Sequence, residues 1–244
     1  MTNNNYDNED FFEKYSEMSR SRLGLSGAGE WPTLEKIMPD LKGKDFLDLG
    51  CGYGWHCFYA AEHGANKIVG VDLSKKMLEV ANKKNTSKKI EFINADISNI
   101  EFPENSFDIV FSSLTFHYLE SYEEMILNIK KYLKPEGQLI FSVEHPIFTA
   151  QGTQDWNYDE RGEIKDFPVD NYFYEGKRDA IFLGEHVTKY HRTLTTYLED
   201  LLKNDFKVEH IIEPMPPQSM MDEPGMKDEM RRPMMLIISA KNSK

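Results

Sequence analysis

A glycine-rich segment holds the residues with the clearest chemical purpose. Residues 48–54 read DLGCGYG, an acid followed by glycines at every second position, and they end an apolar run. Glycine lets the backbone approach a ligand closely and adopt turns that a Cβ atom would obstruct. A plain tight turn rarely needs three alternating glycines, so the pattern indicates a ligand-binding loop. A dinucleotide site would use G-x-G-x-x-G, but its last glycine is replaced by Trp55 or Cys57, depending on the starting point.

Ionisable side chains follow three other apolar runs that are typical of strands. They are Asp72, His117 and the neighbouring pair Glu144 and His145. Ligands of open α/β sheets bind outside the carboxyl ends of the strands, so these positions favour a shared site. Asp72 could instead be a turn or N-cap residue, and a single histidine is more often a structural hydrogen-bonding group.

The elements that must position these residues alternate along the chain between short apolar runs and helical patterns. Strands are predicted at 45–49, 67–71, 90–94, 107–111, 138–143, 206–212 and 234–240. Such alternation is typical of a parallel sheet built from βα units. Ser74, and Ser121 with Glu124 three positions later, are predicted to cap two of the intervening helices.

The alternation breaks after the fifth predicted strand. Residues 145–187 are rich in aromatic residues, glycine and acids and show no long periodic stretch, whereas residues 194–202 regain helical spacing. We expect this insertion to lie over the substrate site as a pocket wall, with a separate small core or a dimer contact as the alternatives. Residues 1–30 include a predicted helix at 11–22, and we expect them to form a helical lid.

The glycine loop and its surroundings resemble the class I S-adenosylmethionine-dependent methyltransferases. The resemblance covers most of the chain and is strongest from Phe46 to His145. The phrases SSLTFHYL and LKPEGQLIFSVEHPIF resemble the small-molecule branch called methyltransferase type 11, and AGEWP, KYHRTLTTYL and EPMP resemble an uncharacterised bacterial subgroup. The resemblance implies one α/β domain over residues 1–244. Its Rossmann-like, doubly wound sheet would have seven mostly parallel strands, with the last strand antiparallel.

The resemblance also implies contacts with S-adenosyl-L-methionine and its product S-adenosyl-L-homocysteine. In this family the glycine loop wraps the amino-acid part of the cofactor, and an acid in the position of Asp72 accepts hydrogen bonds from both ribose hydroxyls. Two carboxylate oxygens suit a vicinal diol. Asp96 could instead be a solvated loop acid, and Met77 a core residue. The implied cofactor contacts are Asp48, Gly50, Cys51, Gly52, Gly54, Asp72, Leu73, Met77, Ala95, Asp96, Ile97 and Ser112, with Tyr15 and Arg20 from the lid.

The composition restricts the expected cellular location of the protein and the kinds of partner it binds. The formal charge is -12, whereas proteins that bind nucleic acid usually present a basic face, so a nucleic-acid partner is disfavoured. The densest basic run, residues 83–89, is interrupted by polar residues. No apolar run approaches the ~20 residues of a membrane span, and residues 1–10 do not resemble a secretion signal, so we expect a cytoplasmic protein without a membrane partner. Cys51 and Cys57 are expected to be small buried thiols.

We expect an enzyme that transfers a methyl group to a small-molecule acceptor. A sulfonium is already a strong electrophile, so the protein mainly aligns an in-line displacement and excludes water. A base is needed only if the acceptor must lose a proton, and His117 and His145 are the candidate catalytic residues. An RNA methyltransferase and an inactive cofactor-binding regulator remain alternatives. No metal is expected, because no HExxH motif occurs, and the protein is expected to be a monomer or homodimer.

Overall fold

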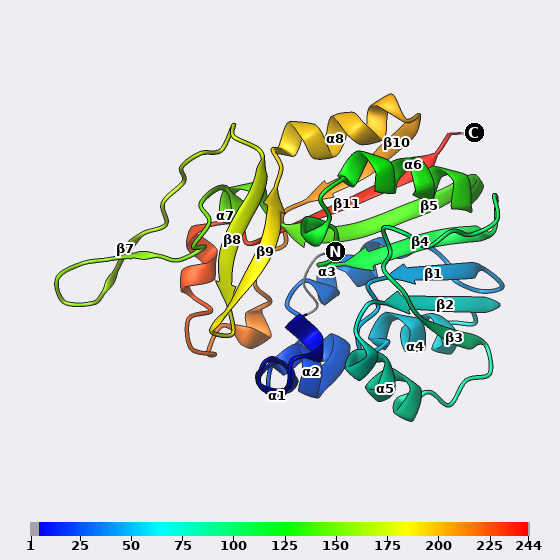
Figure 1. Ribbon diagram of the computed structural model, residues 1–244, viewed down its shortest axis with the longest axis horizontal. Coiled ribbons are helices and arrows are strands. Elements are labelled where there is room, and N and C mark those ends of the chain that lie inside the picture. The colour runs from blue at the N-terminus through cyan, green and yellow to red at the C-terminus, as the bar shows by residue number, and fades with distance from the viewer. Residues whose placement is uncertain (1–4, 244) are drawn as a thin grey trace.

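A seven-stranded sheet forms the centre of the computed structural model, which describes residues 5–243 (Figure 1). The strands are β1 (Asp45–Leu49), β2 (Lys67–Asp72), β3 (Ile90–Asn94), β4 (Phe107–Ser113), β5 (Leu133–Glu144), β10 (Phe206–Ile212) and β11 (Met235–Asn242), in the order β10-β11-β5-β4-β1-β2-β3. Neighbouring strands among β1 to β5 run parallel, whereas β11 is antiparallel to both β5 and β10. The predicted fold class is therefore confirmed.

The strand order places a switch point between β1 and β4. From β1 the chain moves outward through β2 and β3, then returns to β4 on the other side of β1. The loops after β1 and β4 consequently diverge to opposite faces of the sheet and leave a crevice between them, which is where open α/β sheets bind ligands.

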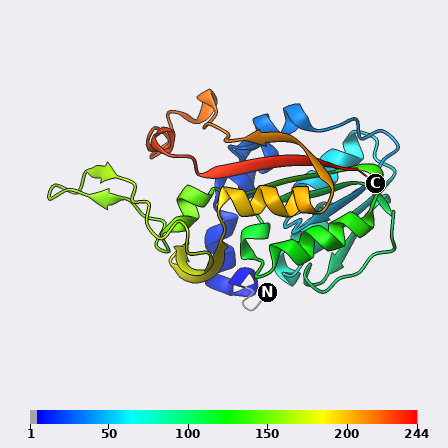
Figure 2. The ribbon, with the colours of Figure 1, turned by 90° about the horizontal axis from the view of Figure 1, so that it is seen from above.

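Helices cover both faces of the sheet (Figures 1 and 2). They are α3 (Trp31–Ile37), α4 (Trp55–Glu62), α5 (Lys75–Lys84), α6 (Tyr122–Tyr132) and α8 (Leu194–Lys203). Because successive strand residues point to opposite faces, Phe46 packs in a core with α3 and α4, while Leu47 packs with α6 and α8. Among residues 5–243, no helix is both long and apolar enough to cross a membrane.

The two predicted serine N-caps are confirmed. Ser74 Oγ accepts a hydrogen bond from Met77 N at 3.1 Å, and Ser121 Oγ accepts one from Glu124 N at 3.4 Å. Each bond satisfies an amide that has no partner within its own helix. The cap at Ser74 starts α5 directly after β2, and its hydroxyl also donates to Asp7 Oδ1 at 2.6 Å.

The insertion after β5 has more regular structure than its sequence indicated. It contains α7 (Pro146–Ala150), the small hairpin of β6 (Asn157–Tyr158) and β7 (Ile164–Asp166), and the larger hairpin of β8 (Gly176–Phe182) and β9 (Glu185–His191). No long periodic stretch was expected within residues 145–187; in β9, most of which lies beyond that range, Val187, Lys189 and His191 are buried in alternation. Two of these three buried positions hold ionisable residues, so no apolar alternation marked the strand. Figure 2 shows the β6–β7 hairpin projecting away from the sheet.

The N-terminal segment and the β8–β9 hairpin lie against each other. The segment forms η1 (Asn5–Asp7), α1 (Glu9–Ser16), α2 (Ser19–Leu23) and η2 (Gly24–Gly27), so the single predicted helix at 11–22 is broken in two. The rings of Phe11 and Phe182 are 5.8 Å apart, and Asn5 Nδ2 donates to the carbonyl of His186 at 2.8 Å. Residues 1–4 of the predicted lid lie outside the described part of the chain.

Replacing Ser74 by alanine should lower the free energy of unfolding by about 1–2 kcal/mol, because the variant loses the helix cap and the bond to Asp7. Denaturant unfolding followed by circular dichroism measures this change. The matched control is Ser219→Ala, an exposed serine outside any α-helix, which should change the same quantity by less than about 0.5 kcal/mol. Equal stability of the two variants would contradict the role given to the cap.

Candidate active site

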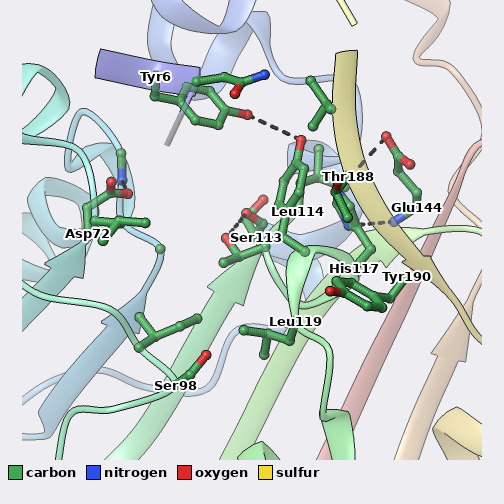
Figure 3. Close-up of a pocket in the computed structure, with 18 of the residues that line it drawn as sticks. Tyr6, Asp72, Ser98, Ser113, Leu114, His117, Leu119, Glu144, Thr188 and Tyr190 are labelled. Atoms are coloured by element: carbon green, nitrogen blue, oxygen red, sulfur yellow. Dashed lines mark hydrogen bonds and ion pairs between the residues drawn. The ribbon is translucent and has the colours of Figure 1, made fainter. Parts of the chain in front are cut away.

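A cavity of about 660 Å³ lies at the carboxyl ends of the parallel strands (Figure 3). Its wall includes Gly52 from the loop after β1, Asp72 from β2 and Glu144 from β5. Its roof includes Tyr6 from the N-terminal segment and Tyr190 from β9. Three of the four side chains predicted to share a site, Asp72, His117 and Glu144, therefore line one cavity, because parallel strands end at one edge of the sheet.

The glycine loop lies on this cavity in a conformation that other residues rarely adopt. Gly50 has φ 81°, and a Cβ atom added there would lie 2.2 Å from Thr115 Oγ1. A Cβ atom added at Gly52 would meet no atom within 4 Å, because Gly52 faces the open cavity. Backbone is therefore exposed where a ligand can approach it.

Asp72 lies beside this loop. Its Oδ2 accepts a hydrogen bond from Gly52 N at 2.8 Å, and its Oδ1 accepts one from Ser74 N at 2.8 Å. Burial raises the pKa of Asp72 to about 6, although these amide bonds act in the opposite direction. Each carboxylate oxygen keeps further acceptor capacity for ligand hydroxyl groups.

The residues after β2 and β3 divide into those that line the cavity and those that do not. Leu73, Met77 and Ile97, which were predicted as cofactor contacts, line it and are joined by Ser98 and Asn99. The predicted contacts Ala95 and Asp96 are outside this lining. The amide of Ala95 donates to the carbonyl of Asp72, and Asp96 Oδ1 accepts from Ser98 N at 2.9 Å, so both residues shape the loop whose next residues face the cavity.

Asp48 and Ser112 are two further predicted contacts that lie outside the cavity lining. Asp48 is fully buried, accepts a bond from Cys57 Sγ at 3.6 Å, and has its pKa raised to about 8 by burial. Ser112 Oγ donates to the carbonyl of Leu49 at 2.7 Å and joins β4 to β1. The next residue, Ser113, lines the cavity instead, because successive side chains in a strand point to opposite faces.

A smaller cavity of about 70 Å³ adjoins the glycine loop and shares Gly50 and Gly52 with the larger one. Arg20 lines both, and its Nη2 lies 3.0 and 2.9 Å from the two carboxylate oxygens of Glu30. Glu30, which the sequence analysis missed, is only 2% exposed. The sequence feature that could have indicated Glu30 is its position as the acid of the AGEWP phrase, where nearby residues are buried.

Three more predicted contacts lie around the same loop. Tyr15 lines both cavities, as Arg20 does. Cys51 lines the smaller cavity, and Gly54 lines neither, since a Cβ atom there would lie 2.6 Å from the Phe92 ring. Cys51 and Cys57 are free, buried thiols, as predicted.

His117 lies in η3 (Phe116–Tyr118), a short helical turn after β4, and is almost fully buried. Its Nδ1 accepts a hydrogen bond from Glu144 N at 3.3 Å, and its Nε2 lies 4.0 Å from Glu144 Oε1. Burial lowers the pKa of His117 to about 4, so the ring is neutral near pH 7. Because Nδ1 accepts a proton donor, the ring proton of this neutral form lies on Nε2.

Glu144 is held by residues of the insertion. Its Oε1 lies 2.6 Å from Lys189 Nζ, and its Oε2 accepts from Gln154 Nε2 at 2.7 Å. Burial alone would raise the pKa of Glu144, but the positive charges of protonated His117 and of Lys189, together with these hydrogen bonds, lower it. Glu144 is therefore an ionised carboxylate at the cavity wall.

His145 and Arg192 do not line the cavity. The Nδ1 of His145 accepts from Ile147 N at 3.1 Å and caps α7, while its Nε2 lies 2.8 Å from Glu213 Oε1. This placement does not support the predicted catalytic role of His145. Arg192 is buried and donates to the carbonyls of Leu119 and Glu120.

The geometry defines a class of protein: an α/β fold with a cavity at the strand tips, beside a glycine loop and an acid on adjacent strands. Residues 47–141 match the family model for a methyltransferase domain. A Listeria monocytogenes protein assigned to the S-adenosylmethionine-dependent methyltransferases is 50% identical, with a TM-score of 0.87 over 91% of this chain and 100% of that one. An S-adenosylmethionine-dependent methyltransferase from Mesorhizobium loti is 39% identical, with a TM-score of 0.83 over 89% of this chain and 100% of that one.

A third similarity covers only part of the chain. Phosphoethanolamine N-methyltransferase 3 of Arabidopsis thaliana is 36% identical over 43% of this chain and 22% of that protein. The two longer matches establish the family. The chain belongs to the S-adenosylmethionine-dependent methyltransferases, the predicted resemblance is confirmed, and S-adenosylmethionine is its cofactor.

Replacing Asp72 by alanine should weaken the binding of S-adenosylhomocysteine by about 10–100-fold, since a lost charge-assisted acceptor costs ~1.5–3 kcal/mol. Isothermal titration calorimetry measures the affinity. Asp40→Ala, in the loop before β1, is the matched control and should bind normally. Unchanged affinity in the Asp72 variant would exclude Asp72 as a cofactor contact.

The same carboxyl group should make cofactor binding depend on pH. Because the pKa of Asp72 is about 6 in the unliganded protein, a falling pH protonates it and removes acceptor capacity. Affinity for S-adenosylhomocysteine should be constant well above pH 6 and decline below it, by at most about tenfold per pH unit. Asp72→Asn should abolish this decline, and an unaltered pH profile in that variant would assign it to another group.

Proposed function

We propose that this methyltransferase transfers the methyl group to a small-molecule acceptor held inside the cavity. The observation that carries the proposal is the roof over the strand tips, formed by the N-terminal segment and the β8–β9 hairpin (Figure 1). A volume of about 660 Å³ is within the range of ~300–1,000 Å³ that is typical of small-molecule sites.

The residues that line the cavity have different roles. The loop at Gly50 and Gly52 brings backbone close to the cofactor, and Asp72 accepts hydrogen bonds from its ribose. S-adenosylmethionine, when bound, supplies a methyl group on a positively charged sulfur atom. Tyr6 and Tyr190 of the roof keep water from the reacting atoms and help to align the acceptor with that methyl group.

The distribution of basic residues favours a small molecule over RNA. The basic run at residues 83–89 lies between the end of α5 and the start of β3, at the edge of the sheet opposite the cavity. Lys134, at the start of β5, is 2.8 Å from both Asp45 and Asp108, and Lys130 is 2.6 Å from Asp205. Lys130 and Lys134 are thus already paired with acids, and the surface around them is a poor match for the phosphate backbone of RNA.

The proposal can be tested before the acceptor is known. Purified protein and methyl-labelled S-adenosylmethionine are added separately to the small-molecule filtrate and to the macromolecular fraction of a bacterial extract. We expect label to enter only the small molecules of the filtrate. At limiting cofactor, Asp72→Ala should reduce the amount of transferred label at least tenfold. Label confined to RNA or protein would contradict the proposal. Tight cofactor binding without any transfer would support an inactive regulator.

A further inference from the structure

One end of the cavity is available to the acceptor, and this inference about it rests on the proposed function. We call it the acceptor chamber and define it by Tyr6, His117, Tyr118, Glu144, Thr188 and Tyr190. Figure 3 shows Asp72 on one side of the cavity, with His117, Glu144 and Tyr190 on the other. A cofactor that reaches from Asp72 to the glycine loop would leave the chamber beside its sulfur.

The only fully charged group of the chamber near neutral pH is a carboxylate. Glu144 lies on the wall, whereas its partner Lys189 lies behind the wall and is only 2% exposed. The Nζ atom of Lys189 donates to Glu144 Oε1 at 2.6 Å and to Gln154 Oε1 at 2.7 Å, so this ammonium group is directed toward protein oxygens. A ligand in the chamber meets the anion of this pair first.

The other nearby cations are also engaged by protein groups. Arg192 donates to the carbonyls of Leu119 and Glu120, behind the wall. Arg20 is the one Lys or Arg among residues 5–243 that lines the cavity, and it pairs with both oxygens of Glu30 on the glycine-loop side. Two further acids, Glu120 and Glu124, line the cavity at exposed positions.

These charges disfavour an anionic acceptor. A phosphate or carboxylate that entered the chamber would lose its hydration and meet Glu144 without a compensating cation, and an unpaired buried charge costs several kcal/mol. Phosphoethanolamine, named for the Arabidopsis relative, carries such a phosphate. The present chamber lacks the charges that would bind that group.

The chamber also lacks a strong base for an alcohol or phenol. Burial raises the pKa values of Tyr6 and Tyr118, whose hydroxyl oxygens are 3.3 Å apart, so both remain protonated. His117 already accepts at Nδ1 and carries its proton at Nε2, and the pKa of Glu144 is lowered. An amine that arrives as an ammonium ion first loses its proton to solvent, and the neutral amine then needs no further base, because its nitrogen presents a lone pair.

Amine methylation moves positive charge toward this carboxylate. The nitrogen lone pair forms the new C–N bond, the C–S bond breaks, and sulfur keeps the bonding electrons. The positive charge passes from sulfur to nitrogen, and the ammonium proton leaves to solvent when the product dissociates. A carboxylate such as that of Glu144 stabilises an ammonium ion, and the tyrosine side chains that line the chamber are compatible with one.

We infer that the acceptor is an amine without a phosphate or carboxylate group, and that Glu144, held by Lys189 of the β8–β9 hairpin, selects for it. The inference joins a carboxylate on the wall, a counter-ion hidden behind it and the aromatic side chains of Tyr6, Tyr118 and Tyr190 that line the chamber. A phosphorylated amine would be rejected at the same position.

The test measures binding of two small probes to protein saturated with S-adenosylhomocysteine. Tetramethylammonium represents the methylated amine and cannot be methylated further, and inorganic phosphate represents the excluded group. By calorimetry we expect tetramethylammonium to bind at least tenfold more tightly than phosphate. Equal affinities, tighter phosphate binding or no binding of tetramethylammonium would overturn the inference.

Variants locate the selectivity at Glu144. Glu144→Gln should weaken tetramethylammonium binding at least tenfold, and the double variant Glu144→Gln with Lys189→Met should do the same without leaving a buried lysine unpaired. Glu104→Gln, an exposed acid in the loop before β4, is the matched control and should bind normally. Unchanged ammonium binding in the folded double variant would contradict the inference.

S-adenosylhomocysteine binding separates this failure from failure of the proposed function. The chamber variants should still bind S-adenosylhomocysteine, because Glu144 and Asp72 lie on opposite sides of the cavity (Figure 3). If the cofactor product binds while the ammonium probe does not, only the acceptor class is wrong. If label enters only RNA or protein in the extract experiment, the proposed function itself is wrong.

Discussion

The hydrogen bond between the Gly52 amide and the Asp72 carboxylate joins the two loops on which the cofactor site depends. It holds the glycine loop after β1 against the tip of β2, while a second bond from Ser74 N fixes the other carboxylate oxygen. The bond from Gly52 requires that the adjacent parallel strands β1 and β2 end together, whereas the bond from Ser74 is local to the turn after β2. The site therefore follows from the sheet. The same burial that gives Asp72 its raised pKa leaves an acceptor poised toward the cavity.

The roof is attached to the sheet by polar contacts as well as by packing. Lys189 of β9 pairs with Glu144 at the tip of β5, and Asp7 of the N-terminal segment bonds to Ser74 at the start of α5. Asn5 of that segment also contacts the hairpin at His186. Two segments far apart in the sequence therefore close the cavity together, and each is anchored at a different strand tip.

The two sides of the cavity differ in how their charges are balanced. On the glycine-loop side, the half-buried Arg20 lines the cavity and pairs with the buried Glu30. On the acceptor side, Glu144 faces inward while Lys189 is hidden. Buried ion pairs are costly unless their remaining hydrogen bonds are satisfied, and Gln154 bonds to both members of the second pair. The bonds to Gln154 thus help to offset the free energy of burying Glu144 and Lys189, while Glu144 gives the acceptor side a negative charge.

The sequence by itself determined the features that depend on neighbouring residues. Strand and helix periodicity predicted the sheet, Ser74 and Ser121 predicted helix starts, and the alternating glycines predicted the loop, because each is a local preference of the backbone. The tertiary structure alone decided which side chains meet. It placed Ser113 rather than Ser112 at the cavity, since strand phase depends on the pairing of β4, and used His145 as a cap. It also brought Glu30, Tyr6 and Lys189 to the site, because burial among distant elements leaves no periodic pattern around a single polar residue.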